Sequence, residues 1–168
     1  MGTEQSREYY ENFHRDSSRY GVHYSKSTYF PMFALVIEEI KRRNLANILE
    51  VGCGSGTLAQ FIMDRTLVRY RGFDFSASAV ERAGKRVGRS DLFYVGDARD
   101  AKSYASEYEG IVCTEVLEHI EADLDVIRNW RSGAVCICSV PNFMDESHVR
   151  VFKHEGRSEC PLWRPDRH

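Results

Sequence analysis

A glycine-rich turn is the first feature of the sequence whose residue types and spacing suit binding chemistry. Glycines alternate with small residues in Gly52-Cys53-Gly54-Ser55-Gly56, after a short apolar run, so the backbone can approach a ligand closely at the start of a helix. Glu50 precedes the first glycine by two residues and would repel a pyrophosphate but attract a cation. Thr57 occupies the position of the last glycine of the dinucleotide fingerprint. The turn therefore favours a cationic ligand and disfavours a nicotinamide dehydrogenase.

Polar residues also follow three further apolar runs. Asp74 ends the second run, Gly96-Asp97-Ala98 follows the third, and Glu115, Glu118 and His119 follow the fourth. Each group has an ordinary explanation by itself, as a helix cap, a tight turn or an acidic helix start. One ligand that bound beyond the ends of four neighbouring strands would explain all of them together.

The segments that must position these residues predict a layered α/β architecture. Helices are expected from Pro31, from Leu58 and from Ser78, where Ser78 and Glu81 have the spacing of a capping box, and a longer helix is expected over 116–130. Because the strands are apolar throughout, they predict a parallel sheet covered on both faces, with ligands at the carboxyl ends of its strands. The expected strands are 47–51, 68–74, 92–95, 110–114 and 134–140.

The first strand and its turn carry a family resemblance. Residues 48–56, Ile-Leu-Glu-Val-Gly-Cys-Gly-Ser-Gly, resemble the first motif of class I S-adenosylmethionine-dependent methyltransferases, and the later strand ends agree in order and spacing over about residues 30–143. The resemblance implies a Rossmann-like, doubly wound, mainly parallel sheet with strand order 3-2-1-4-5. This class normally adds a helix and two strands after the fifth strand, whereas the residues after Pro141 show no such pattern.

The resemblance also implies a cofactor and the residues that bind it. S-adenosyl-L-methionine is the expected methyl donor, and S-adenosyl-L-homocysteine is the expected product. By resemblance, Asp74 would bind the ribose hydroxyls, Asp97 would bind the adenine, and Glu115 would lie beside the donor. The expected cofactor-binding residues are Glu50, Gly52, Cys53, Gly54, Asp74, Phe75, Asp97, Ala98 and Glu115.

The expected reaction is methyl transfer to an oxygen or nitrogen atom of a small-molecule acceptor. Such a transfer depends on alignment and desolvation, and it needs a base only if the acceptor must lose a proton. The sequence assigns no catalytic residue, although His23, His119 and His148 are candidate bases. Two alternatives stay open. One is a non-catalytic or truncated S-adenosylmethionine-binding domain that acts with a partner, and the other is a metal-assisted O-methyltransferase.

One constellation resembles a metal site. It consists of Glu115, Glu118 and His119, with E-x-x-E-H spacing, and of His148 beyond the fifth strand. The set is similar to the metal site of the small-RNA 2′-O-methyltransferases, and its first half is similar to ubiquinone-pathway O-methyltransferases. Carboxylates and imidazoles together can hold Mg²⁺ or another divalent ion. The segment 115–119 also resembles family members without a metal, so the sequence assigns no metal ligand.

Composition limits the partners and the compartment. The 168 residues include 23 Lys and Arg against 25 Asp and Glu, a net charge of −2, so no nucleic-acid partner is expected. The polar N-terminus lacks a signal or transit pattern, and no apolar run is long enough to span a membrane, which predicts a soluble, cytoplasmic protein. Cys136 and Cys138 share one face of the fifth expected strand and are interpreted as small core residues.

The chain, 1–168, is expected to form a single methyltransferase domain with three parts. Residues 1–30 are rich in tyrosine and are expected to form an N-terminal lid segment, with Tyr20–Tyr29 as part of a lid over the donor, or else to pack outside the core. Residues 31–143 would form the cofactor-binding core and 144–168 a short tail. The fifth strand carries no charge and would lie at a sheet edge, where a second copy of the chain could pack to give a homo-oligomer, unless Val149–Phe152 covers it.

Overall fold

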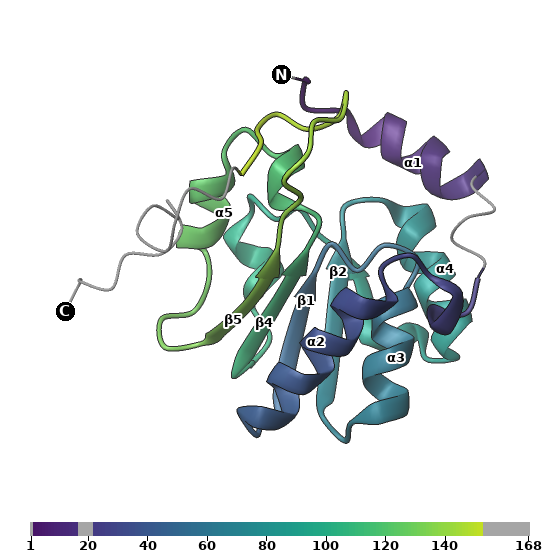
Figure 1. The fold of residues 1–168 in the computed structure, drawn as a ribbon, viewed down its shortest axis with the longest axis vertical. Coiled ribbons are helices and arrows are strands. Elements are labelled where there is room, and N and C mark those ends of the chain that lie inside the picture. The colour runs from purple at the N-terminus through teal and green to yellow at the C-terminus, as the bar shows by residue number, and fades with distance from the viewer. Residues whose placement is uncertain (1, 17–21, 153–168) are drawn as a thin grey trace.

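A parallel five-stranded sheet forms the centre of the protein in the computed structural model, which describes residues 2–16 and 22–152 (Figure 1). The strands are β1 Asn47–Val51, β2 Arg69–Asp74, β3 Phe93–Val95, β4 Gly110–Thr114 and β5 Val135–Ser139. Their order is β3-β2-β1-β4-β5, and every neighbouring pair is parallel. The expected fold class and strand order are therefore confirmed.

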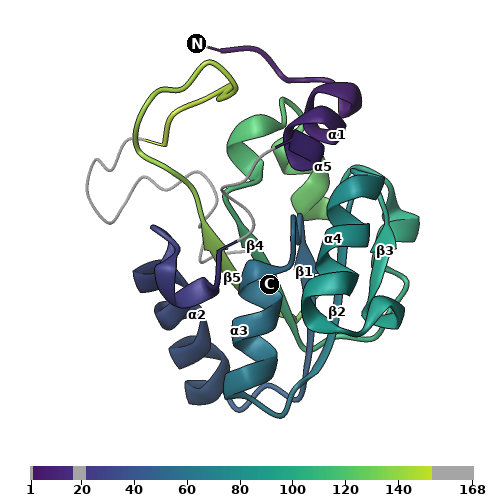
Figure 2. The same ribbon diagram turned by 90° about the vertical axis from the view of Figure 1, so that its right-hand side faces the viewer.

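Helices cover both faces of the sheet. Since successive strand residues point to opposite sides, each strand contributes side chains to both helix layers. Ile48 of β1 belongs to an apolar cluster with α2 and α3, whereas Leu49 packs in a second cluster with α5. Figures 1 and 2 show α2, α3 and α4 together on one face. No helix within the described ranges is both long and apolar enough to cross a membrane. The helices on the sheet are α2 Phe30–Arg42, α3 Thr57–Arg65, α4 Ala77–Val87 and α5 Asp123–Arg128, with short helices η2 Tyr24–Lys26, η3 Ser90–Leu92, η4 Ala101–Tyr104 and η5 Leu117–His119.

The N-terminal helix α1, Arg7–Asp16, lies across the end of the sheet at which the strands finish (Figures 1 and 2). The segment that follows β5 lies at the same end. Within the expected lid segment, Tyr24 is buried in the core, where its ring stacks on Phe61 at 4.5 Å between centroids. Tyr20 lies outside the described residues. The described part of the expected 1–30 segment that lies over the strand ends is α1, which precedes Tyr20–Tyr29.

The single helix expected over 116–130 is wrong, because long-range hydrogen bonds interrupt it. The structure has η5 and α5 in its place. The carbonyl oxygen of Glu118 accepts a hydrogen bond from the N–H of Val149 at 2.8 Å. The N–H of Glu121 donates to the Glu4 carboxylate at 2.8 Å. In a continuous helix both groups would bond to residues four positions away.

The start of α4 also differs from expectation, because Ser76 rather than Ser78 is its N-cap. The Oγ of Ser76 accepts a hydrogen bond from the N–H of Ala79 at 3.2 Å. Glu81 forms no capping box and pairs with a lysine one turn later. The N–H of Ser78 donates instead to the Glu11 carboxylate of α1 at 3.0 Å, a long-range contact that local spacing does not reveal.

Strand β5 is an edge strand, since within the described residues it pairs with β4 alone. Residues 149–152, the expected alternative cover, form no strand. The interpretation of Cys136 and Cys138 as core residues is wrong, because both are exposed. Ile137 between them packs into the cluster with α2, so the two cysteines face the other side of the sheet at its open edge. Homo-oligomer formation through this edge stays a prediction.

Candidate functional site

The glycine-rich turn joins β1 to α3, and its geometry requires glycine at two positions. Gly52 has a φ of +69° and Gly56 a φ of +75°, in the left-handed region that favours glycine. A Cβ on Gly52 would lie 2.4 Å from Cγ2 of Val116, and one on Gly56 would lie 2.9 Å from Cα of Ala83. The turn is therefore packed directly against α4 and against the segment that follows β4.

Asp74 ends β2 and is buried against this turn. One carboxylate oxygen accepts a hydrogen bond from the N–H of Gly54 at 3.0 Å, and the other accepts one from the N–H of Ser76 at 2.9 Å. Burial raises the pKa of Asp74, although both amides favour its charged form. The structure thus brings Asp74 and the glycine turn together at the ends of β1 and β2.

Glu50 lies deeper in the sheet and is only 2 % exposed. The hydroxyl of Tyr70 donates a hydrogen bond to its carboxylate. Burial raises the pKa of Glu50 to about 8, and the Tyr70 hydrogen bond opposes part of that shift. Cys53 is also buried, and burial raises the pKa of its thiol. The thiol is therefore protonated at neutral pH, which argues against a nucleophilic role.

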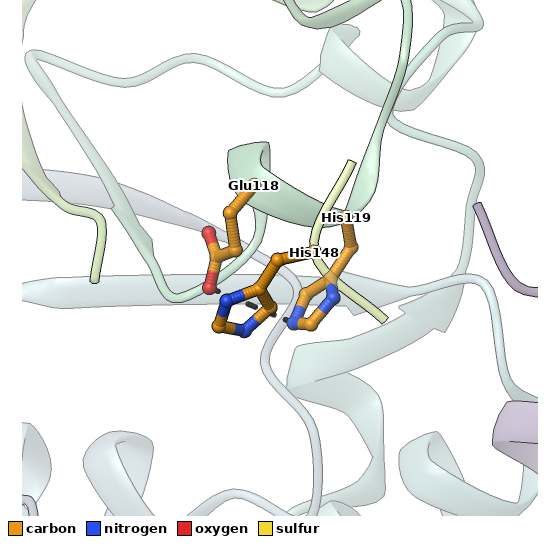
Figure 3. Close-up of side chains that lie close together, drawn as sticks. All are labelled: Glu118, His119 and His148. Atoms are coloured by element: carbon orange, nitrogen blue, oxygen red, sulfur yellow. Dashed lines mark ion pairs between the residues drawn. The ribbon is translucent and has the colours of Figure 1, made fainter. Parts of the chain in front are cut away.

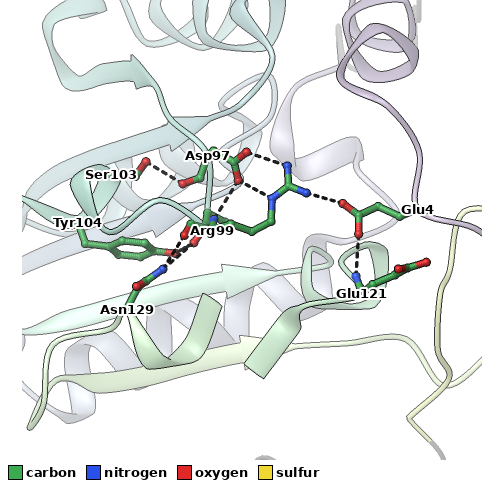
Figure 4. Close-up of polar contacts among 8 residues, drawn as sticks. Glu4, Asp97, Arg99, Ser103, Tyr104, Glu121 and Asn129 are labelled. Atoms are coloured by element: carbon green, nitrogen blue, oxygen red, sulfur yellow. Dashed lines mark hydrogen bonds and ion pairs between the residues drawn. The ribbon is translucent and has the colours of Figure 1, made fainter. Parts of the chain in front are cut away.

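Asp97 and Ala98 follow β3 at the same end of the sheet. Asp97, labelled in Figure 4, lines a pocket that is called the crevice here. The Arg99 guanidinium contacts the Asp97 carboxylate at 2.7 Å and holds the pKa of that carboxyl below its usual range. The carbonyl oxygen of Ala98 accepts a hydrogen bond from the Tyr104 hydroxyl at 2.8 Å. The crevice has a volume of about 470 Å³ and contains two of the expected cofactor residues. Its lining residues are Glu4, Gln5, Ser6, Arg7, Phe75, Asp97, Arg99 and Glu121.

Helix α1 covers the part of the crevice beside the loop after β2. The Tyr10 ring packs on Phe75 at 5.2 Å between centroids, and it meets the His119 ring edge-on at 5.9 Å. The Tyr10 hydroxyl oxygen is buried and has no hydrogen-bond partner in the part of the chain that the structure describes. The Glu11 carboxylate accepts hydrogen bonds from the first N–H groups of α4. These contacts fix α1 between the crevice and the segment after β4.

A second group of titratable side chains lies at the same end of the sheet (Figure 3). Glu118, His119 and His148 each bring one possible ligand atom within 4.8 Å of the others. Nε2 of His119 lies 3.6 Å from Oε1 of Glu118. Nδ1 of His119 contacts the Ser147 carbonyl oxygen at 2.9 Å, and Nδ1 of His148 contacts that of Phe143 at 3.1 Å. An imidazole that donates from Nδ1 to a carbonyl keeps the Nε2 lone pair for a metal ion.

Glu118 is the titratable group of this cluster whose polar atoms have the fewest partners. It is 1 % exposed, and neither carboxylate oxygen has a hydrogen-bond partner among residues 2–16 and 22–152. The pKa of Glu118 is raised to about 8, chiefly by burial and to a smaller extent by the nearby Glu115 charge. Burial lowers the pKa of His119. Buried carboxylates are normally hydrogen-bonded, paired or bound to a metal, so this donor set fits a divalent cation.

Two of the residues considered in the sequence lie outside this cluster. Oε1 of Glu115 accepts a hydrogen bond from the Ser139 hydroxyl at 2.7 Å, and the backbone of Glu115 is left-handed with a φ of +55°. His23 is an exposed N-cap of η2 that accepts a hydrogen bond from the N–H of Ser25. Of the three candidate bases, the structure therefore brings only His119 and His148 together.

Several residues of the site were not identified from the sequence. Tyr10 and Glu11 of α1, and Glu4 before it, reach the crevice only through contacts with residues at least 60 positions away in the chain, as in the bond from Glu121 to Glu4. The aromatic composition of the first thirty residues pointed to the region. No spacing within the sequence distinguished these side chains from their neighbours.

Comparison with known proteins gives relatives at low identity. "Nodulation protein S" of Azorhizobium caulinodans is 29 % identical over 82 residues, which cover 46 % of this chain and 37 % of that protein. The crystal structure of small RNA methyltransferase HEN1 has a TM-score of 0.64 at 20 % identity, over 74 % of this chain and 20 % of that one. The structural likeness shows a shared fold, and this chain spans well under two thirds of the length of each protein.

A further solved structure contains the demethylated cofactor. The plantazolicin methyltransferase BpumL, in complex with a triazolic desmethylPZN analog and S-adenosylhomocysteine, has a TM-score of 0.52 at 20 % identity, over 73 % of this chain and 45 % of that one. The family model described as "Methyltransferase domain" matches residues 27–168, which is most of the sequence. The chain therefore belongs to the methyltransferase-domain family, and its sheet has the strand order of a Rossmann-like fold.

Proposed function

We propose that this protein transfers the methyl group of S-adenosylmethionine to a hydroxyl oxygen of a small molecule, with a divalent metal ion bound by Glu118, His119 and His148. The observation that carries the metal-assisted function is the buried Glu118 carboxylate, which has two oxygens without a hydrogen-bond partner in the described chain and two imidazoles beside it. This geometry favours the metal-assisted alternative over transfer without a metal. Oxygen is the proposed acceptor atom because a hydroxyl gains most from a cation that stabilises its deprotonated form.

The cofactor is proposed to bind where the glycine turn meets Asp74 and Asp97. Gly52 and Gly54 would allow the close approach of its methionine part, Asp74 would accept hydrogen bonds from the ribose hydroxyls, and Asp97 would accept one from the adenine amino group. The buried Glu50 would face the positive charge of the cofactor through the turn. The other proposed contacts of the cofactor are Cys53, Phe75, Ala98 and Glu115.

The metal site is proposed to have two histidines whose orientation is already set. Nδ1 of each ring is held by a backbone carbonyl oxygen, so Nε2 of each ring is available as a ligand. A divalent ion bound there would act as a Lewis acid toward an acceptor hydroxyl. Imidazole and carboxylate ligands suit Mn²⁺ and other first-row ions, and Mg²⁺ accepts carboxylates.

The chain itself contributes alignment and the exclusion of water. Tyr10 contacts Phe75 on the cofactor side and His119 on the metal side, so its ring occupies the region between the two proposed sites. Helix α1 is held in this place by the Glu11 carboxylate at the start of α4. Methyl transfer between a sulfonium and an oxygen proceeds best where the reacting atoms are aligned and water is absent.

A small, uncharged acceptor suits the charges around the cluster. Glu115 and Asp145 both lie close enough to His119 to affect its titration, and Tyr29 nearby is affected by the same two acids. With a net charge of −2, the chain also has no overall positive charge to attract a polyanion. We therefore propose a small-molecule alcohol or phenol rather than a nucleic acid.

The test is methyl transfer from labelled S-adenosylmethionine to a panel of alcohols, phenols, amines and short RNAs, with EDTA or added Mn²⁺. We expect transfer to a hydroxyl compound that EDTA abolishes and Mn²⁺ restores. His148→Ala should abolish it, whereas the matched control His23→Ala, at an exposed histidine outside the cluster, should not. Transfer to an amine that resists EDTA, or to RNA, would contradict the proposal. Binding of the cofactor without transfer to any acceptor would support the non-catalytic alternative.

A further inference from the structure

The residues at the start of the described chain contact the segment that carries His148. The N–H of Gly2 donates to the His148 carbonyl oxygen at 3.0 Å, and the N–H of Thr3 donates to that of Glu146 at 3.2 Å. Figures 1 and 2 show the N-terminus beside the loop that follows β5. Residues 2–4 are named the N-terminal clasp here.

We propose that the N-terminal clasp positions His148 as a metal ligand, an inference that rests on the proposed function. His148 lies in a segment without helix or strand, so hydrogen bonds to other segments fix its position. On one side, the N–H of Val149 bonds to the Glu118 carbonyl oxygen at 2.8 Å, and His119 Nδ1 contacts the Ser147 carbonyl oxygen at 2.9 Å. The clasp supplies the corresponding backbone bonds on the other side.

Glu4 anchors the other end of the clasp (Figure 4). Its carboxylate accepts a hydrogen bond from Nη1 of Arg99 and one from the N–H of Glu121, both at 2.8 Å. Arg99 also binds Asp97 beside the pocket. The clasp therefore runs from the proposed cofactor pocket to the proposed metal cluster, and it is tied to the fold at both ends. Its residues act through His148, so they are positioning residues.

Gly2 is the position at which the clasp can be disturbed without changing a metal ligand. A Cβ on Gly2 would lie 2.1 Å from the Glu146 carbonyl oxygen and 2.9 Å from that of Asp145. Both are backbone atoms, so Gly2→Ala must push the clasp and the loop apart. Thr3→Ala is the matched control, because it removes an exposed hydroxyl that, among the described residues, accepts a hydrogen bond from the Gln5 amide, and it keeps the backbone bond to Glu146.

The experiment measures Mn²⁺ binding to the full chain by electron paramagnetic resonance, together with S-adenosylhomocysteine binding by calorimetry. We expect Gly2→Ala to weaken Mn²⁺ binding by about 10- to 100-fold, the range that residues supporting metal ligands contribute. Thr3→Ala should bind Mn²⁺ as the wild type does. Without metal, hydrogen exchange of the amides in 145–149 should be faster in Gly2→Ala than in either other protein, and retained cofactor binding would show that the fold is intact.

Three results would overturn the inference, and the first two separate its failure from that of the proposed function. If the wild type binds Mn²⁺ and Gly2→Ala binds it equally well, the clasp does not position His148, while the proposed function stands. If the wild type binds no Mn²⁺, the proposed metal site fails and the role of the clasp in metal binding fails with it. Loss of Mn²⁺ binding that is equally large in Thr3→Ala would also contradict a role specific to the backbone bonds of Gly2.

Discussion

Two carboxylates at the same end of the sheet are buried to a similar degree, but their charges are satisfied differently. Asp74 is 7 % exposed, and each of its oxygens accepts a hydrogen bond from a backbone N–H. Glu118 is 1 % exposed, and neither of its oxygens has such a partner in the described part of the chain. Within residues 2–16 and 22–152, backbone N–H groups thus donate to both oxygens of Asp74, whereas no hydrogen bond reaches the oxygens of Glu118.

The difference distinguishes a group that the folded backbone satisfies from one that, in the proposed function, is satisfied by a bound cation. Asp74 stabilises the turn it belongs to, so its removal should affect both folding and ligand binding. Glu118 buries a carboxyl group whose raised pKa costs stability at neutral pH unless a cation binds to its charged form. The comparison therefore predicts that changes at the two positions can be told apart by measuring stability and binding together.

Removal of the Glu118 charge should have the largest effect on binding. We expect Glu118→Gln to weaken Mn²⁺ binding by more than about 100-fold, the upper end of the loss caused by residues that merely support ligands. The metal-free variant should be at least as stable as the wild type at neutral pH, because the cost of raising the Glu118 pKa by burial is removed. Calorimetry and thermal unfolding measure both quantities, with Asp125→Asn on the exposed face of α5 as the control. A variant that is markedly less stable and still binds Mn²⁺ would contradict this interpretation of Glu118.

Asp74→Ala should affect both quantities. Loss of charge-assisted hydrogen bonds to the ribose should weaken S-adenosylhomocysteine binding by about 10- to 100-fold. The N–H groups of Gly54 and Ser76 would lose their partner, at a cost of about 1–3 kcal/mol for each buried group. Calorimetric titration and urea unfolding test the two effects. Unchanged affinity would remove Asp74 from the proposed cofactor site, and unchanged stability would contradict its role in the turn.

Glu50 is intermediate between Asp74 and Glu118, because this buried carboxyl group accepts a hydrogen bond from one neutral partner, the Tyr70 hydroxyl. Burial raises its pKa in the folded protein to about 8, so between its ordinary pKa and that value the unfolded chain has lost a proton that the folded protein keeps. This contribution to stability is complete at low pH and is lost as the pH rises, by about 1.4 kcal/mol per pH unit. Urea unfolding from pH 5 to pH 8 should show that decline relative to Glu50→Gln. Parallel pH profiles would contradict it.

The smallest effect on either site is expected at the β5 edge, which lies outside both of them. Cys136→Lys would place a charge on an exposed edge strand, which opposes edge-to-edge pairing. Light scattering should then show less self-association than in the wild type, while Mn²⁺ and cofactor affinities stay unchanged. A wild type that is monomeric at high concentration would contradict the predicted homo-oligomer.

Local sequence pattern predicted the sheet well, because each strand is a short apolar run bounded by glycine or polar residues. Strand bounds for β1 and β4 agree with expectation at both ends, and the order follows the family resemblance. The pattern failed where tertiary hydrogen bonds replaced local ones. Glu4 interrupts the helix expected over 116–130, and Glu11 takes the N–H of Ser78 at the start of α4.

The candidate site divides in the same way. Asp74, Asp97 and Glu118 were singled out as candidates because Asp74 ends a strand and the other two closely follow one. The Glu118–His119–His148 grouping could be suggested by resemblance, but the 4.8 Å separation of its ligand atoms depends on how the chain folds back after β5. The support from the N-terminal residues was not predictable, because Gly2 and Thr3 contact that segment through backbone groups, which carry no sequence signal.

The backbone of Glu115 has a consequence for any attempt to improve this protein by selection. A side chain other than glycine at a φ of +55° carries a conformational cost of about 1–2 kcal/mol, and here Ser139 holds both the N–H and the carboxylate of Glu115. Glycine at this position would relieve that cost and remove a negative charge beside Glu118. Selection for thermal stability alone would therefore favour Glu115→Gly. In the proposed function, selection for cation binding would keep Glu115.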